Sequence, residues 1–174
     1  MPPDVRTELQ QQLAPYRRAF PDARWTRPET WHLTLLFLGS VRPDRVPELT
    51  ILVDEVAGRG SAYGVVVDRG GGRTRRSEGV AWLGLSDGAG ALIEAATVAA
   101  DGCPEEITLG APPKRTPSAH LTVVRNASPA VVDALRDQAF GRLGVGWTID
   151  RVGLVRSHLE PDGARYETLH EATL

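Results

Sequence analysis

The stretch WHLTLLFLG, residues 31–39, places one histidine and one threonine in an otherwise apolar run. The triplet His-Leu-Thr occurs again in AHLTVVR, residues 119–125. Both runs are dense in leucine, valine or phenylalanine, which predicts β-strands. Residues two apart in a strand point to the same face. We therefore expect His32 to share a face with Thr34, and His120 to share one with Thr122, while the intervening leucines point into the core.

Either triplet alone is most simply explained by a buried histidine beside a common strand-forming threonine. Two of the chain's four histidines begin the triplet. With ordinary residue usage, that coincidence is expected only on the order of a few times in ten thousand. Both copies also begin strand-like runs. The pair therefore indicates a shared chemical purpose.

The composition favours one cytoplasmic domain that does not bind long nucleic acids through bulk charge. The chain has 174 residues and a net charge of −2, so no overall positive field attracts DNA or RNA. A single cysteine, Cys103, excludes an internal disulfide and suits a reducing compartment. No apolar run approaches the roughly 20 residues of a membrane helix, and no signal-peptide core is present. Nineteen of the 20 basic residues are arginine, but they are spread along the chain, so codon preference explains them adequately.

Hydrophobic periodicity predicts an alternation of helices and strands with a pseudo-repeat. Helices are expected over 4–20, 43–56, 87–100 and 128–141, with Asp87 and Ser128 as N-caps and a stop at Gly141. Strands are expected over 24–26, 32–38, 62–67, 80–85, 120–125, 147–157 and 165–169, whereas the glycine- and arginine-rich residues 68–79 suggest a loop. The order favours an α+β fold, bilobal and pseudo-symmetric, with two antiparallel sheets facing a central cleft and helices outside. We expect one domain, 1–174, with lobes of roughly 1–68 and 79–174 that can exchange strands.

Two facing histidines suit a reaction that needs both a general base and a general acid. A histidine pKa near 6.5 allows one ring to be neutral while the other is protonated. A threonine hydroxyl two residues on can hold a phosphoryl oxygen. The set fits attack of water on a phosphodiester, with no metal or other cofactor. The sequence contains no HExxH zinc motif, GxSxG elbow or GxxxxGK[ST] loop, and His158 and His170 have no matching threonine.

Further motifs around the triplets resemble the two-histidine phosphoesterases, in particular the RNA 2′,3′-cyclic phosphodiesterases, also called 2′-5′ RNA ligase-like proteins. RWTRPETWHLTLLFLG (24–39) is similar to the family's first motif, VAWLGL (80–85) to the strand that opens its second lobe, AHLTVVR to its second motif, and SHLEPDGARYETL (157–169) to its ending.

The resemblance implies metal-independent opening of a 2′,3′-cyclic phosphate to a 2′-phosphate. His32 would donate a proton to the 3′ oxygen, and His120 would activate water. Thr34 and Thr122 would hold phosphate oxygens. Arg125 would be a phosphate ligand, although strict alternation turns it away from His120, so a bulge or strand end must bring it back. The partners implied are RNA 3′ ends or nucleotides that bear a 2′,3′-cyclic phosphate. We also expect a monomer that has no membrane association.

Two departures from the family concern the rim of the site. Relatives usually begin with a strand before the first helix, and this chain opens at PPDVRTELQ, so base recognition is expected to differ. The loop expected at 68–79 also lacks an aromatic-proline step.

Other functions remain open at the level of sequence. The same chemistry suits another cyclic phosphate, such as an ADP-ribose derivative, and the same groups could join RNA ends through a 2′-5′ linkage without ATP. A non-catalytic module that binds phosphate ends is a further alternative, although pure binding does not require paired proton-transfer groups.

Overall fold

The computed structural model confirms the α+β class and describes residues 1–75, 78–86, 88–101, 103, 107, 114–115, 118–136, 144–160 and 163–174. The described helices are α1 (Pro3–Ala19), α2 (Val46–Arg59), α3 (Gly88–Asp101) and α4 (Pro129–Arg136), with short 3₁₀ turns at Pro28–Thr30 and Pro43–Arg45. The strands are β1 (Arg24–Trp25), β2 (Leu36–Phe37), β3 (Tyr63–Arg75), β4 (Glu78–Leu85), β5 (Lys114–Arg115), β6 (His120–Arg125), β7 (Gly146–Ile149), β8 (Arg151–Glu160) and β9 (Gly163–Thr173). None of the helices among these residues is both long and apolar enough to cross a membrane.

The chain folds into two compact units, each assembled from three separate segments. Unit 1 contains residues 1–33, 64–86 and 120–147, and unit 2 contains residues 34–63, 87–119 and 148–174. Each unit therefore takes segments from both halves of the chain.

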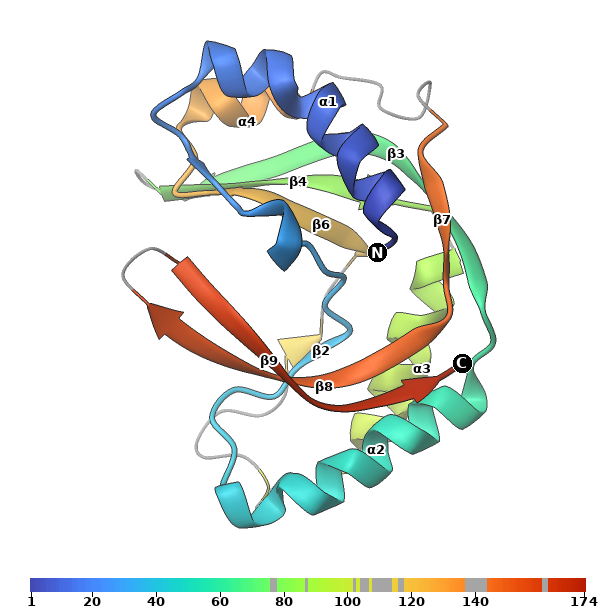
Figure 1. Ribbon diagram of the computed structural model, residues 1–174. Helices are drawn as coiled ribbons and strands as arrows, with labels where there is room; N and C mark the ends of the chain where they lie inside the picture. Colours follow the sequence, from blue (N-terminus) through green and yellow to red (C-terminus); the bar gives the residue numbers. More distant parts are fainter. Residues whose placement is uncertain are drawn as a thin grey trace. The chain divides into compact units, whose positions relative to one another are not determined.

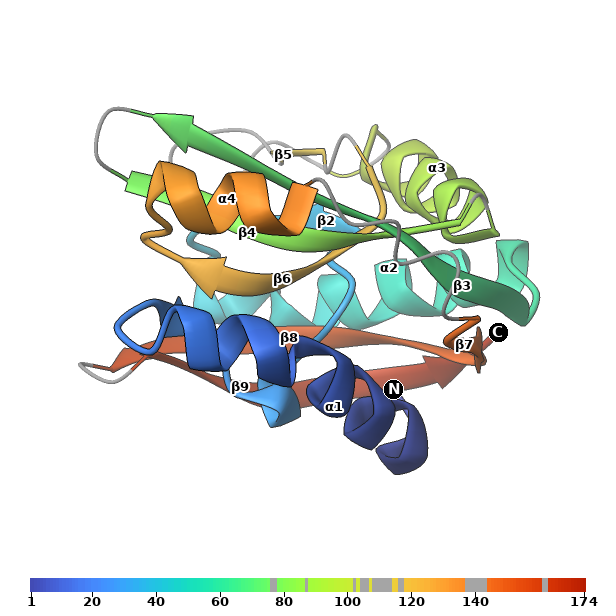
Figure 2. The same ribbon diagram turned by 90° about the horizontal axis from the view of Figure 1, so that it is seen from above.

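Unit 1 is a five-stranded sheet with two helices on one face. The strand order is β1-β6-β4-β3-β7, and the pairs of β6 with β1 and β4, and of β3 with β4, are antiparallel. Figure 1 shows α1 and α4 on the same side of this sheet, and Figure 2 separates α4, which lies over β4, from α1. The helical spacing of Val5, Leu9 and Leu13 puts all three on the buried side of α1. They contribute to a core whose sheet side includes Leu83 and Leu121.

Unit 2 combines a long β-hairpin with two helices and a short strand pair. Strands β8 and β9 pair along their full length, α2 packs against both, and β2 pairs with β5. Figure 1 shows α2 running along the hairpin. The core of this unit is formed by Val56 of α2 with Leu92, Ala96 and Ala99 of α3.

The prediction of a loop over residues 68–79 is wrong, because most of this segment extends β3 and begins β4. Glycine permits unusually close packing here rather than marking a turn. A Cβ atom on Gly71 would overlap the indole nitrogen of Trp82, and one on Gly72 would lie 2.6 Å from a methyl group of Val132 in α4. The glycines let one face of β3 accept a tryptophan ring and the other face accept a helix.

The continuous strand expected over 32–38 is shorter than predicted because its two ends serve different units. Leu33 forms an isolated antiparallel bridge with Leu121 in unit 1, whereas Leu36 and Phe37 pair with β5 in unit 2. At α4, the Ser128 hydroxyl accepts a hydrogen bond from the Val131 amide at 3.4 Å, which confirms the predicted N-cap. The cap expected at Asp87 and the helix stop expected at Gly141 lie outside the described residues.

Candidate active site

Strand β6 presents His120 and Thr122 on the face of the unit 1 sheet opposite the helices. Both residues are half-buried, while Leu121 and Val123 are buried on the other side. This is the alternation that the sequence predicts. We call the face that bears His120 and Thr122 the site face.

A β-bulge brings Arg125 to the site face. His120 lies opposite Gly84 and Thr122 opposite Trp82, but the next residue of β4, Ala81, lies opposite Val124. Val123 is thus the extra residue of the bulge, and it reverses the alternation beyond it. Arg125, opposite Val80, returns to the face of His120. The structure therefore contains the irregularity that Arg125 requires if it is to reach the same ligand as the histidine.

His32 lies beside β6, within unit 1. The antiparallel bridge between Leu33 and Leu121 sets His32 opposite Thr122. The Nδ1 atom of His32 is 2.7 Å from the Thr30 carbonyl oxygen, so it carries a proton and donates to that oxygen. This fixes the tautomer, with the proton on Nδ1.

The electrostatic surroundings of His32 lower its pKa. The largest cause is desolvation by the protein atoms around the ring, although the residue keeps an exposed edge. The hydrogen bond to Thr30 raises the pKa, and the charges of Arg125 and His120 lower it. Because these charges act on His32, the two histidines and Arg125 form one electrostatic cluster.

A chain of hydrogen bonds connects the two histidine motifs at the bulge. The indole nitrogen of Trp31 donates to the Thr26 hydroxyl oxygen at 2.9 Å. That hydroxyl donates to the carbonyl oxygens of Thr122 and Val123, at 3.0 and 3.1 Å. The residue before His32 is thereby joined to the backbone on which Thr122 sits. Sequence reasoning assigned no role to Trp31 or Thr26, because nothing in their spacing indicates that they meet β6.

Trp82 packs against His120 on the site face. The two ring centroids are 5.4 Å apart and the ring planes are tilted by 48°. The indole occupies the space left by Gly71, so strand β3 supports it from the other side. Trp82 belongs to the VAWLGL strand, but a strand pattern alone does not reveal a ring contact with a histidine.

Thr34, the last of the five predicted site residues, lies in unit 2, as do His158 and His170. Thr34 is half-buried and is the first residue of that unit, and its role in phosphate binding stays a prediction. His158 bonds to Glu167 at 2.9 Å and His170 bonds to Asp54 at 2.8 Å. Both histidines are thus engaged with carboxylates of unit 2. Within the described ranges, no group of three or more His, Cys, Asp or Glu side chains is arranged to hold a metal ion.

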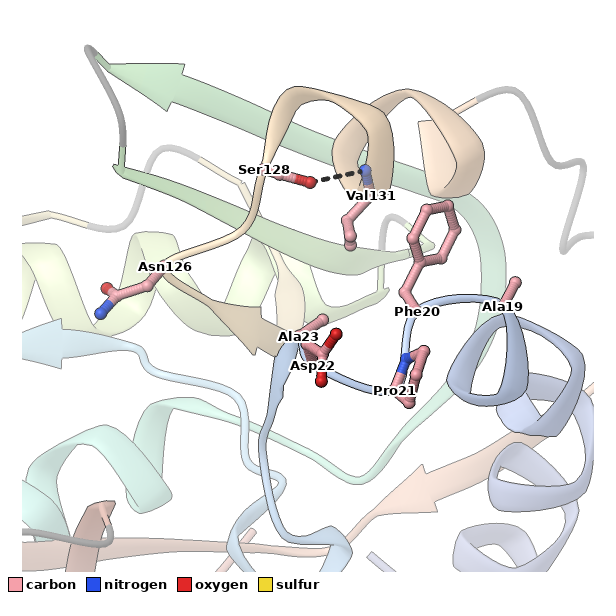
Figure 3. A pocket seen from close by; sticks show the side chains of 8 residues that line it. All are labelled: Ala19, Phe20, Pro21, Asp22, Ala23, Asn126, Ser128 and Val131. Carbon is pink, nitrogen blue, oxygen red and sulfur yellow. Dashed lines mark hydrogen bonds between the residues drawn. The ribbon is translucent and has the colours of Figure 1, made fainter.

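A separate pocket of about 270 Å³ lies between the end of α1 and the start of α4 (Figure 3). Phe20, Asp22, Asn126 and Val131 are among its lining residues, and none of the five predicted site residues lines it. Because the carboxylate of Asp22 adds negative charge, the pocket is poorly suited to a phosphate.

Comparisons with known proteins agree with the fold and the motifs. A sequence model of the family described as LigT like Phosphoesterase matches residues 1–82, which include the first histidine motif. The solved structure of TT0787 from Thermus thermophilus is similar over 100% of this chain and 93% of its own, with 23% identity and a TM-score of 0.77. E. coli LigT complexed with 3′-AMP is similar over 100% of this chain and 93% of its own, with 23% identity and a TM-score of 0.74. No curated protein matches in sequence.

The fold is therefore that of the LigT-like phosphoesterases. The resemblance drawn from the two histidine motifs is confirmed, by sequence for residues 1–82 and by fold for the whole chain. The second motif, at residues 119–125, lies outside the segment that the family sequence model matches, so its support comes from the geometry of β6 and the shared fold.

Proposed function

We propose that the protein is an enzyme that acts on phosphodiester bonds and opens 2′,3′-cyclic phosphates at RNA 3′ ends or on nucleotides. The observation that carries this proposal is the electrostatic cluster of His32, His120 and Arg125, with Thr122 on the same face of unit 1. E. coli LigT has been solved with 3′-AMP and with phosphate, which supports a nucleotide or phosphate ligand for the shared fold.

The proposed reaction needs only proton transfers and charge stabilisation. His120 accepts a proton from water as the water oxygen bonds to phosphorus. The bond from phosphorus to the 3′ oxygen breaks, and His32 Nε2 donates a proton to that oxygen. The products are a 3′ hydroxyl group and a 2′-phosphate. Thr122, Arg125 and Thr34 hold the non-bridging oxygens, where negative charge grows during attack.

The lowered pKa of His32 is compatible with its role as the acid. In the free protein the neutral ring is favoured, because desolvation and the positive charge of Arg125 oppose its protonation. The cyclic phosphodiester carries one negative charge. Its arrival beside His32 favours the protonated ring and raises the pKa. The substrate thus helps to charge the acid that cleaves it.

The same groups support joining of RNA ends. A 5′ hydroxyl group in place of water would attack the cyclic phosphate, lose its proton to His120 and form a 2′-5′ linkage, again with release of the 3′ hydroxyl. The joining reaction consumes no ATP. A cyclic phosphate on an ADP-ribose derivative would be opened by the same steps. We expect the reaction to take place in the cytoplasm, since the single cysteine suits a reducing compartment.

The first experiment measures hydrolysis of a nucleoside 2′,3′-cyclic phosphate, with EDTA present, by the wild type, His32→Ala and His120→Ala. Loss of each proton-transfer group is expected to lower kcat by about 10²–10⁴-fold, with the 2′-phosphate as the product of the wild type. His158→Ala and His170→Ala are matched controls and should keep full activity, because their rings bond to Glu167 and Asp54 in unit 2.

Failure of the wild type to turn over the substrate, or activity unchanged from the wild type in both site variants, would contradict the proposal. Retained binding of the cyclic phosphate without turnover would favour the binding module instead. Turnover restricted to an ADP-ribose cyclic phosphate in a substrate panel would preserve the chemistry and change the substrate.

A further inference from the structure

Three arginines form one cross-strand row on the site face, beyond Thr122. Arg73 of β3 lies opposite Val80 of β4, Val80 lies opposite Arg125 of β6, and Arg125 lies opposite Arg24 of β1. Directly opposed residues in antiparallel strands share a face. We call Arg24, Arg73 and Arg125 the arginine row.

Sheet geometry sets the spacing of this row. Neighbouring strands are about 4.8 Å apart, so the Cα atoms of Arg24 and Arg125 are roughly 5 Å apart and those of Arg125 and Arg73 roughly 10 Å apart. On β4, the row at Val80 is two residues from the row at Trp82 and Thr122, a distance of about 7 Å along the strands. Arg125 can thus reach a phosphate held by Thr122. Arg73 lies two strands from Arg125, on the side away from β1.

Arg73 and Arg125 differ from the nearby Arg69 in their surroundings. Both residues are exposed, as is Arg24. On the same strand and face as Arg73, Arg69 pairs with Asp68 at 3.3 Å. Among the side chains that the structure describes, neither Arg73 nor Arg125 has an ion-pair partner.

We propose that Arg73 forms a subsite for a phosphodiester that adjoins the reacting phosphate. This proposal rests on the proposed function, because Arg125 and Thr122 are taken to hold the reacting group. Arg73 lies two strands from Arg125 along the row, and its guanidinium can bind phosphate oxygens in a bidentate manner. Val80, between Arg73 and Arg125, is half-buried and uncharged, so the row offers two separated cationic positions rather than one. The subsite distinguishes substrates with several phosphates from single nucleotides.

The test compares two substrates with and without the subsite. One is a mononucleoside 2′,3′-cyclic phosphate, and the other is a short single-stranded oligoribonucleotide that ends in the same group. The wild type should prefer the oligonucleotide by about tenfold or more in kcat/KM, the size of one charge-assisted phosphate contact. Arg73→Ala should remove most of this preference. Arg18→Ala is the matched control, because Arg18 is an exposed arginine of α1, on the helix side of the sheet.

Salt dependence gives a second readout that a merely structural effect would not move. Loss of one phosphate contact should make the slope of log kcat/KM for the oligonucleotide against log salt less steep by about 0.7. Equal changes for both substrates in Arg73→Ala, or a wild type with no preference for the oligonucleotide, would overturn the subsite and leave the proposed function intact.

Failure of the wild type to hydrolyse either substrate would instead count against the proposed function. In that case, equilibrium binding of the same oligonucleotide decides the subsite. Weaker binding by Arg73→Ala than by Arg18→Ala would support it, and equal binding would refute it.

Discussion

The most informative single residue is His32, whose proton is controlled by its neighbours. The Thr30 carbonyl accepts the proton of Nδ1 and thereby fixes the tautomer of the ring. Desolvation of the ring comes first among the causes that lower its pKa, followed by the Arg125 and His120 charges that oppose protonation. The ring is tuned by groups on separate stretches of the chain.

Replacement of Arg125 by glutamine should raise the pKa of His32. The substitution removes a positive charge that disfavours the imidazolium form, and protonation becomes easier when that charge is gone. Titration of the histidine ring signals by NMR measures the shift. Arg18→Gln should leave the His32 titration unchanged. Inorganic phosphate added to the wild type should raise the pKa as well, and a decrease in either experiment would contradict the assignment of the cluster.

At the level of elements, the bulge in β6 decides which residues reach the site. Without Val123 as an extra residue, Arg125 would face the helices. The Thr26 hydroxyl donates to the carbonyl oxygens of Thr122 and Val123, and the Trp31 indole N–H donates to that hydroxyl. The bulge is thus held by residues of the first histidine motif.

Thr26→Val should lower both stability and activity. The variant keeps the side-chain shape, but it leaves the Trp31 indole N–H without its acceptor, at a cost of about 1–3 kcal/mol in the free energy of unfolding. Displacement of Thr122 and Arg125 should lower kcat/KM by roughly 10- to 100-fold. Denaturant unfolding and steady-state kinetics measure the two effects.

The serine variant separates the hydroxyl group from the methyl group at this position. Thr26→Ser keeps the hydrogen bonds and should recover most of the activity, whereas Thr148→Val, at an exposed strand position, should behave like the wild type. Full activity in Thr26→Val would show that the bulge does not depend on this contact.

Much of the local structure followed from sequence because it depends on near neighbours. Alternation predicted that His120 and Thr122 share a face, and the cap at Ser128 needed only the residues after it. For Arg125, the sequence predicted only that a bulge or strand end must bring it to the face of His120. The strand over Gly70 to Gly72 was not predictable, since its glycines are explained by Trp82 and Val132, which arrive from other elements. The contact of Thr26 with β6 spans nearly a hundred residues and likewise has no local signal.

At the scale of the whole molecule, the chain passes between the two units after Leu33, Tyr63, Ser86, Ala119 and Trp147. The sheet of unit 1 forms only when the chain has returned to this unit from unit 2. Strand β6, which lies between β1 and β4, comes from a segment far along the chain from both. Neither unit corresponds to a continuous piece of sequence.

Fragments 1–86 and 87–174 should therefore fail to fold when each is expressed alone. The first lacks β6 and α4, so β1 loses its sheet partner and the core of unit 1 loses Leu121 and Leu135. The second lacks α2, against which β8 and β9 pack. Circular dichroism and the dispersion of amide NMR signals measure the outcome, with the full chain as the control. A native-like spectrum from either fragment would refute the dependence of the units on exchanged segments.

The contact between Trp82 and His120 has a consequence for observing the enzyme. An imidazolium group beside an indole ring alters the excited state of the indole, so the emission of Trp82 is expected to change as His120 gains or loses its proton. The rings are 5.4 Å apart, and Gly71 leaves room for the indole. Because the chain has three other tryptophans, the Trp82 signal is the difference in emission between the wild type and Trp82→Phe. Trp82 can serve as a built-in optical reporter of the charge on the proposed catalytic base.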